Sequence, residues 1–170
     1  MTNTKDTQLM SAGRAERAVN RIARQILEDT RGAGNLVLFG VDDRGHALAA
    51  LLASGLEEIL GKKIPFHKLS IKKETRGRPV TGVDITGSFV ILIDDVIFSG
   101  KTMYRAFKQV MKLGDPEQVR LAVLIDRGHR IYPVQAQYVG LVCPTKPAEH
   151  VHCAFMDEKP SGVWLNVKLL

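Results

Sequence analysis

The 170-residue sequence has few cysteines and no long hydrophobic run. Its two cysteines, Cys143 and Cys153, are too few for a disulfide framework and lack the spacing of zinc or redox sites, so we interpret both as buried thiols. The longest apolar runs, such as Val90–Ile93, are far shorter than the ~20 residues that span a bilayer. The polar segment Met1–Gln8 is not typical of a secretory signal, which favours a cytoplasmic protein without membrane contact.

Aromatic residues are also scarce, at 6% of the chain, and no segment has the aromatic sheet motif of single-strand RNA-binding domains. Hydrophobic residues at 45% and charged residues at 25% are ordinary globular usage, which excludes an intrinsically disordered chain. The length suits one domain with a sizeable core. We therefore predict a single domain over residues 1–170 with no internal repeat or linker.

The net charge of +6 is concentrated in one segment. Lys62–Arg78 contains seven basic residues and one acid, a local excess of 7 − 1 = +6. Such a local excess suggests an anionic ligand, although a solvated basic face is the alternative. A second basic stripe lies on the first predicted helix, where Arg14, Arg17, Arg21 and Arg24 could bind phosphates or simply face water.

The hydrophobic pattern alternates between helical and strand periods, which implies right-handed crossovers and a parallel sheet in an α/β fold. Helices are predicted at Leu9–Arg31, His46–Leu60 and Thr102–Leu113, and buried strands at Leu36–Val41, Phe89–Ile93 and Val119–Ile125. Loops are expected at Asp42–Gly45 and Asp94–Lys101, further strands at Ile64–Ile71 and Tyr138–Val142, a mobile excursion at Lys72–Thr86, and short edge strands at His150–Phe155 and Val163–Val167.

The most informative segment is Val90–Thr102, in which a buried strand ends in Asp94 and Asp95 and a small-residue loop then opens a helix. Ligands bind at the carboxyl ends of strands in such sheets. The backbone amides of Phe98–Thr102 can face a phosphate at the helix N-terminus, whereas the two carboxylates suit neutral hydroxyls or a metal ion. A sugar phosphate fits both halves. A Walker P-loop is excluded because Asp95 occupies the position of its first glycine.

These thirteen positions resemble the phosphoribosyl-pyrophosphate (PRPP) signature of type I phosphoribosyltransferases. The resemblance implies a single-domain type I phosphoribosyltransferase fold: a central parallel sheet flanked by helices, a flexible loop at about 72–86, and a small hood from about 127–136 and the C-terminal segment. It also implies that Asp94 and Asp95 contact the ribose hydroxyls. The substrate-binding residues in this segment would be Val96 and the phosphate-cradling Phe98, Ser99, Gly100, Lys101 and Thr102.

Leu121–Arg130, Tyr138–Gly140 and Pro144-Thr145 resemble the bifunctional pyrimidine-operon regulator/uracil phosphoribosyltransferase family. That likeness implies conversion of uracil and PRPP to UMP and pyrophosphate with Mg²⁺, a homodimer or higher oligomer, and binding of leader mRNA. Arg44 and Gly45, in the turn after the first strand, are suited to the pyrophosphate. We expect Arg127 to contact pyrophosphate as a catalytic residue, Arg130 to lie nearby, and Val142 to begin the strip that recognises uracil.

The chain departs from that family at two places. Leu141 stands where the family usually has lysine, and the Leu69–Arg76 segment lacks the usual pattern of the mobile loop. Two alternatives therefore stay open: a UMP-sensing RNA-binding regulator with weak or no catalysis, and a purine-base phosphoribosyltransferase. A zinc site is not expected, because Cys153 should point away from His150 and His152. No direct protein ligand for a metal is predicted.

Overall fold

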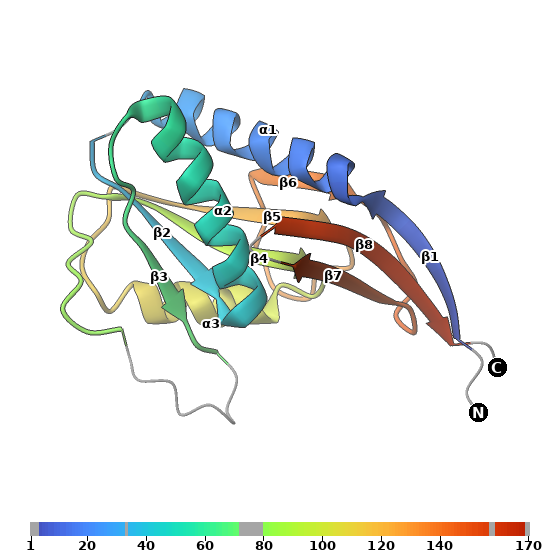
Figure 1. Ribbon diagram of the computed structural model, residues 1–170. Helices are drawn as coiled ribbons and strands as arrows, with labels where there is room; N and C mark the ends of the chain where they lie inside the picture. Colours follow the sequence, from blue (N-terminus) through green and yellow to red (C-terminus); the bar gives the residue numbers. More distant parts are fainter. Residues whose placement is uncertain (1–3, 33, 72–79, 157–158, 169–170) are drawn as a thin grey trace.

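The computed structural model describes residues 4–32, 34–71, 80–156 and 159–168. Within them lies a five-stranded parallel sheet of order β3-β2-β4-β5-β6, flanked by helices as predicted (Figure 1). Its elements are β2 (Leu36–Val41), β3 (Phe66–Leu69), β4 (Phe89–Ile97), β5 (Gln118–Asp126), β6 (Tyr138–Val142), α1 (Ala12–Thr30), α2 (Asp42–Leu60) and α3 (Lys101–Val110). The remaining strands are β1 (Thr4–Ser11), β7 (His150–Met156) and β8 (Lys159–Lys168).

Two apolar layers enclose the parallel sheet. Side chains alternate across a strand, so Ile91 and Ile93 of β4 pack with α1 and α2, whereas Val90 and Leu92 pack with α3 on the other face. Figure 1 shows the same arrangement, with α1 and α2 together and α3 across the sheet. Burial on both faces explains why these strands read as continuous apolar runs.

β1, β8 and β7 form a second, antiparallel sheet, which we call the terminal sheet. It joins both ends of the chain, which lie side by side in Figure 1. Val163–Val167 was expected as an edge strand but belongs to the central strand of this sheet. β1 was not predicted, and Leu9 and Met10 lie in it rather than in the first helix. The helix begins after Ser11, whose side chain accepts a hydrogen bond from the Arg14 amide at 3.4 Å.

Other boundaries also differ from the predictions. Asp42–Gly45 forms the first turn of α2 rather than a loop, and β4 continues to Ile97, so that both acids of the signature lie in a strand. Cys153 is buried as predicted, but Cys143 is only partly buried. Residues 127–136, predicted to be part of a hood, contain no helix or strand. Of the excursion, residues 72–79 lie outside the described residues, and 80–86 contain no helix or strand.

Among the helices of the described ranges, none combines the length and the hydropathy that crossing a bilayer requires.

Candidate active site

Asp94 and Asp95 line a cavity of about 490 Å³ at the carboxyl end of β4, which we call the acid pocket. Asp95 is only 7% exposed, and its Oδ1 accepts a hydrogen bond from the Val96 amide at 2.9 Å. Its Oδ2 is buried and receives no N–H or O–H donor from the described part of the chain. A buried acceptor without a donor is costly, so this oxygen is suited to a ligand that brings one. The full lining is Val41, Asp42, Asp43, Arg44, Asp94, Asp95 and Thr102.

The two acids differ in their electrostatic state. Burial, followed by repulsion from Asp95, raises the pKa of the Asp94 carboxyl well above its usual value. Asp94 Oδ1 also accepts a hydrogen bond from the Asp95 amide at 2.9 Å, which fixes the carboxyl at the end of the strand. The pocket therefore holds a carboxyl group that binds a proton, or a cation in its place, more readily than an exposed aspartate does.

Close packing fixes the first turn of α2 beside these acids. A Cβ on Gly40 would lie 2.4 Å from the Gly45 carbonyl oxygen, and one on Gly45 would lie 2.5 Å from the Ile93 carbonyl oxygen. Asp42 has a φ of 52°, a left-handed conformation that is unusual for a residue with a side chain and is often found at functional sites. The turn brings Arg44 to the pocket, with Nη1 3.7 Å from Asp95 Oδ2.

The phosphate loop, residues Phe98–Thr102, leads from β4 into α3. Gly100 has a φ of 82°, and a Cβ there would lie 2.3 Å from Val134 Cγ2, so this position requires glycine. The first amides of α3 have no partner within the helix and lie at the positive end of its dipole. Thr102 of this loop lines the acid pocket. The structure thus brings the two acids and Thr102, the last residue of the phosphate loop, to one cavity.

Arg127, a predicted site residue, is only 7% exposed, and its guanidinium forms hydrogen bonds within the protein. Its Nε donates to Thr145 Oγ1 at 2.6 Å, and its Nη2 donates to the carbonyl oxygens of Glu149 at 2.6 Å and Lys146 at 3.2 Å. The guanidinium also lies 4.3 Å from the centre of the Phe98 ring. Arg127 therefore ties the segment after β6 to the phosphate loop. Because Nε and Nη2 donate to these acceptors, a contact with pyrophosphate would use Nη1.

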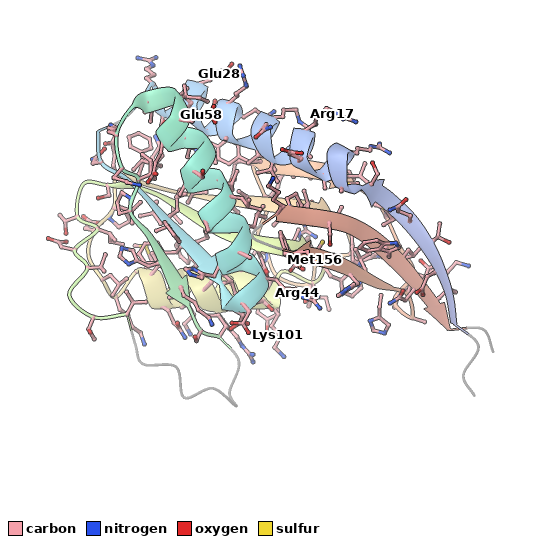
Figure 2. The ribbon with its side chains drawn as sticks, in the orientation of Figure 1. Arg17, Glu28, Arg44, Glu58, Lys101 and Met156 are labelled. Carbon is pink, nitrogen blue, oxygen red and sulfur yellow. The ribbon has the colours of Figure 1, made fainter. Side chains whose placement is uncertain are left out.

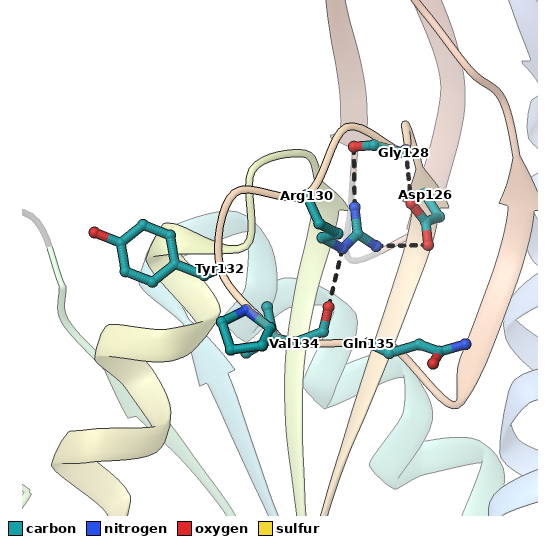
Figure 3. Close-up of a pocket in the computed structure, with 7 residues that line it drawn as sticks. Asp126, Gly128, Arg130, Tyr132, Val134 and Gln135 are labelled. Atoms are coloured by element: carbon teal, nitrogen blue, oxygen red, sulfur yellow. Dashed lines mark hydrogen bonds and ion pairs between the residues drawn. The ribbon is translucent and has the colours of Figure 1, made fainter.

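Arg130 lies in a separate open pocket of about 450 Å³, in which its guanidinium is surrounded by acceptors (Figure 3). Nη2 pairs with Asp126 Oδ2 at 2.6 Å, Nε donates to the Val134 carbonyl at 3.1 Å, and Nη1 donates to the carbonyls of Gly128 at 3.1 Å and Phe98 at 2.7 Å. This side chain therefore holds the 127–136 segment against the phosphate loop.

Val142, Lys63 and Lys68 are not among the residues that line the acid pocket. Val142 is 64% exposed at the end of β6, where it pairs with Asp126. Within Lys62–Arg78, Lys63 pairs with Glu57 at 3.0 Å and Lys68 pairs with Asp43. Lys72, Lys73, Arg76 and Arg78 lie outside the described residues.

Sequence reasoning missed His152. Its Nδ1 lies 3.0 Å from Arg44 Nη2, although 108 residues separate the two along the chain. Because the contact depends on how the terminal sheet is placed on α2, no local pattern could have shown it.

Comparison with known proteins supports the assignment made from the residues. Residues 6–158 match the phosphoribosyl transferase domain model. The chain is 38% identical to the bifunctional protein PyrR of Geobacter sp. strain M21, over 94% of this chain and 97% of that protein. It is 40% identical to the PyrR protein of Deinococcus radiodurans, over 89% and 88% of the two chains.

Solved structures show the same fold. A hypoxanthine-guanine phosphoribosyltransferase from Bacillus anthracis has a TM-score of 0.74 and 22% identity, over 97% of this chain and all of that one. The hypoxanthine phosphoribosyltransferase of Trypanosoma cruzi has a TM-score of 0.70 and 21% identity, with 81% and 82% covered. The signature between β4 and α3, the fold and these matches agree: the chain belongs to the phosphoribosyl transferase family and is similar to its PyrR members.

Proposed function

We propose that this protein transfers the phosphoribosyl group of PRPP to uracil, giving UMP and pyrophosphate. The observation that carries the proposal is the acid pocket, where a buried Asp95 oxygen without an N–H or O–H donor lies beside Asp94 and the phosphate loop. A ribose brings hydroxyl donors and its 5′-phosphate brings the anion. One ligand therefore matches both halves of the site.

The roles follow from the chemistry of each group. Asp94 and Asp95 accept hydrogen bonds from the ribose hydroxyls, and the loop amides from Phe98 to Thr102 bind the 5′-phosphate. Arg44 faces the pyrophosphate, since a guanidinium pairs with phosphate oxygens in a bidentate manner. In the reaction a uracil nitrogen loses its proton and forms a bond to C1 of the ribose as the bond from C1 to pyrophosphate breaks, and the proton passes to the released pyrophosphate or to water. The protein mainly positions the two substrates and stabilises charge.

The oxygen donors of the acid pocket suit Mg²⁺, which is a hard cation that usually binds one or two carboxylates together with substrate oxygens. Among the described residues no three or more His, Cys, Asp or Glu side chains are grouped to hold a metal, so the ion would be shared with PRPP. Asp94 and Asp95 are the groups that would hold it. When bound, the ion would neutralise charge that develops on the leaving pyrophosphate.

A base-by-base activity panel tests the proposal. The protein is incubated with PRPP, Mg²⁺ and one of uracil, hypoxanthine, guanine or orotate, and nucleotide formation is measured. We expect UMP from uracil and little product from the other bases. Asp95→Asn should remove activity while the fold is retained, as judged by circular dichroism. Product from hypoxanthine or guanine alone would instead assign a purine-base enzyme, and no turnover with any base would contradict catalysis.

The similarity to PyrR proteins favours RNA-binding regulation of pyrimidine genes as a second function. Arg14, Arg17 and Arg24 are exposed along α1, whereas Arg21 is held by the carbonyls of Val139 at 3.1 Å and Gly140 at 2.6 Å. Three arginines of the stripe therefore remain available for phosphates. Salt-dependent binding to a pyrimidine-operon leader, strengthened by UMP, would support this function. Equal binding to an unrelated RNA would show that the arginines of the stripe attract RNA without sequence specificity.

A further inference from the structure

Arg44 forms the wall between two cavities. One is the acid pocket, and the other, of about 360 Å³, lies between the start of α2 and strand β7 of the terminal sheet. Figure 2 labels Arg44 at this end of α2. The second cavity is lined by Asp43, Arg44, Ala47, His152, Cys153, Ala154 and Phe155. The terminal sheet therefore reaches the edge of the proposed PRPP site and contributes side chains from the far end of the chain.

The Arg44 guanidinium lies closer to His152 than to Asp95. Nη2 lies 3.0 Å from His152 Nδ1, whereas Nη1 is 3.7 Å from Asp95 Oδ2, beyond hydrogen-bond distance. An arginine has only donors, so Nδ1 acts as the acceptor and the ring proton lies on Nε2. The contact thus requires a neutral imidazole in one tautomer.

The imidazole itself is held by the terminal sheet. His152 pairs in register with Trp164 of β8, and the two rings are 6.5 Å apart. The neighbouring residue Cys153 is buried beside Asp95, and burial raises the pKa of its thiol. β7 is therefore anchored beside the site by its pairing with β8 and by the burial of Cys153.

Holding Arg44 before the ligand arrives has an energetic consequence. The Arg44 side chain is 50% exposed, and a free arginine side chain loses rotamer entropy when a ligand immobilises it. A hydrogen bond from a strand-anchored histidine removes part of that freedom in the unliganded protein. Ligand binding then costs less, which is the general effect of preorganisation.

We propose that His152 is a positioning residue, which holds the Arg44 guanidinium at the mouth of the acid pocket for the pyrophosphate group of the substrate. The proposal rests on the proposed function, because it assigns the pyrophosphate to Arg44. It concerns affinity for a pyrophosphate-bearing ligand. The terminal sheet is thereby a part of the substrate site as well as a cover for the core.

Three variants test this role. His152→Leu removes the acceptor, His152→Asn places an amide oxygen close to the position of Nδ1, and His150→Leu changes an exposed histidine on the same strand as a matched control. Calorimetric titration with PRPP and, separately, with inorganic pyrophosphate gives the affinities. Steady-state kinetics give KM for PRPP, KM for uracil and kcat.

We expect His152→Leu to weaken PRPP and pyrophosphate binding about tenfold, the effect of one charged hydrogen bond. The KM for PRPP should rise by a similar factor, with little change in the KM for uracil. His152→Asn should recover most of the affinity and His150→Leu should match the wild type. A general loss of fold would instead lower kcat and weaken the binding of both substrates. Asparagine would then not restore the affinity for PRPP.

The outcomes separate the two proposals. If the wild type binds PRPP and His152→Leu binds it as tightly as His150→Leu does, the positioning role is overturned while the proposed function stands. If the wild type binds neither PRPP nor pyrophosphate, the proposed function fails first. If His152→Leu and His152→Asn are equally impaired, the contribution of His152 is packing, and the inference is again overturned.

Discussion

Replacing Asp94 by asparagine should make the protein more stable and less active. Burial and the neighbouring Asp95 raise the pKa of the Asp94 carboxyl, which means that its charged form is disfavoured in the folded state. Asparagine is of similar size and is never charged. Its side-chain oxygen can still accept the hydrogen bond from the Asp95 amide that Asp94 Oδ1 accepts at 2.9 Å. The substitution therefore removes the electrostatic penalty and keeps the local geometry.

The expected gain follows from linkage. Each unit by which folding raises a pKa corresponds to about 1.4 kcal/mol, so removing the raised pKa of Asp94 should increase the free energy of unfolding at neutral pH. For a domain of this length 1 kcal/mol changes Tm by about 2–4 °C, so the gain should be visible as a higher Tm in thermal denaturation. The activity should fall severely, because the amide cannot replace the carboxylate toward ribose hydroxyls and a cation.

The stability gain of Asp94→Asn should depend on pH. A raised folded-state pKa means that the wild type carries the full penalty above that pKa and loses it as the pH falls toward the unfolded value of about 3.9. The advantage of Asp94→Asn should therefore be largest near neutral pH and shrink toward about pH 4. Denaturation curves of both proteins across this range measure it.

Asp84 supplies the control for this experiment. Hydrogen bonds from the Thr86 side chain and amide lower the pKa of its carboxyl, so its charge favours folding. Asp84→Asn should bring no gain at neutral pH, and its loss should fade with acidification. If Asp94→Asn lowers Tm at neutral pH, or if its gain does not change with pH, the electrostatic account of the acid pair is refuted.

Three further substitutions test the supports of the site. Gly100→Ala should lower stability by about 1–3 kcal/mol, because the new Cβ would lie 2.3 Å from Val134 Cγ2 at a φ of 82°, and thermal denaturation measures it. Arg130→Met should cost about 3 kcal/mol by removing the ion pair of Asp126 Oδ2, although Oδ1 keeps its hydrogen bond from the Gly128 amide, and a double variant with Asp126→Leu should recover part of the loss in a double-mutant cycle. Tyr138→Phe should cost about 1 kcal/mol without changing activity, since its hydroxyl donates to Asp29 Oδ2 at 3.1 Å and accepts from Arg120 Nη1 at 3.2 Å, and Tyr138 does not line the acid pocket.

The parallel sheet could be predicted because its signal is local. Leu36–Val41 is buried at every position, and such runs identify central strands of a sheet that is covered on both faces. The terminal sheet could not be predicted in the same way. Met10 of β1 pairs with Val163 of β8, so the strand is stabilised by a partner at the other end of the chain. The residues of β1 themselves show only a weak hydrophobic pattern.

The start of α2 was predicted wrongly for a different reason. Four polar or small residues in a row indicated a loop at Asp42–Gly45, yet acids in the first turn of a helix are favoured by its dipole. The same run could therefore have been interpreted as a helix start. At β4 the strand continues through Asp94 and Asp95 despite the low strand propensity of aspartate, because Asp94 pairs with Val123 and Ile97 pairs with Asp126 of β5.

The arginines show why a site is harder to predict than a fold. The sequence identifies Arg127 and Arg130 as cations near the carboxyl edge of the sheet, where anions are expected to bind. It does not show their acceptors, which are mainly backbone carbonyls such as those of Glu149 and Phe98. A buried guanidinium needs such acceptors, and here they use most of its donors. Position at the sheet edge was therefore predictable, whereas availability for a ligand was not.

The acid pocket brings together residues that depart from the usual preferences of a folded chain, which marks it as the functional site. Asp42 has a left-handed backbone, Asp94 has a raised pKa, and a buried oxygen of Asp95 lacks an N–H or O–H donor. Each is unfavourable for folding by itself, and all three residues line one cavity. A purely structural role would leave this coincidence without a cause. A ligand with hydroxyl donors and a phosphate accounts for the Asp95 oxygen and the acid pair together, since it adds hydrogen-bond donors to an oxygen whose ion pair with Arg44, at 3.7 Å, is too long for a hydrogen bond.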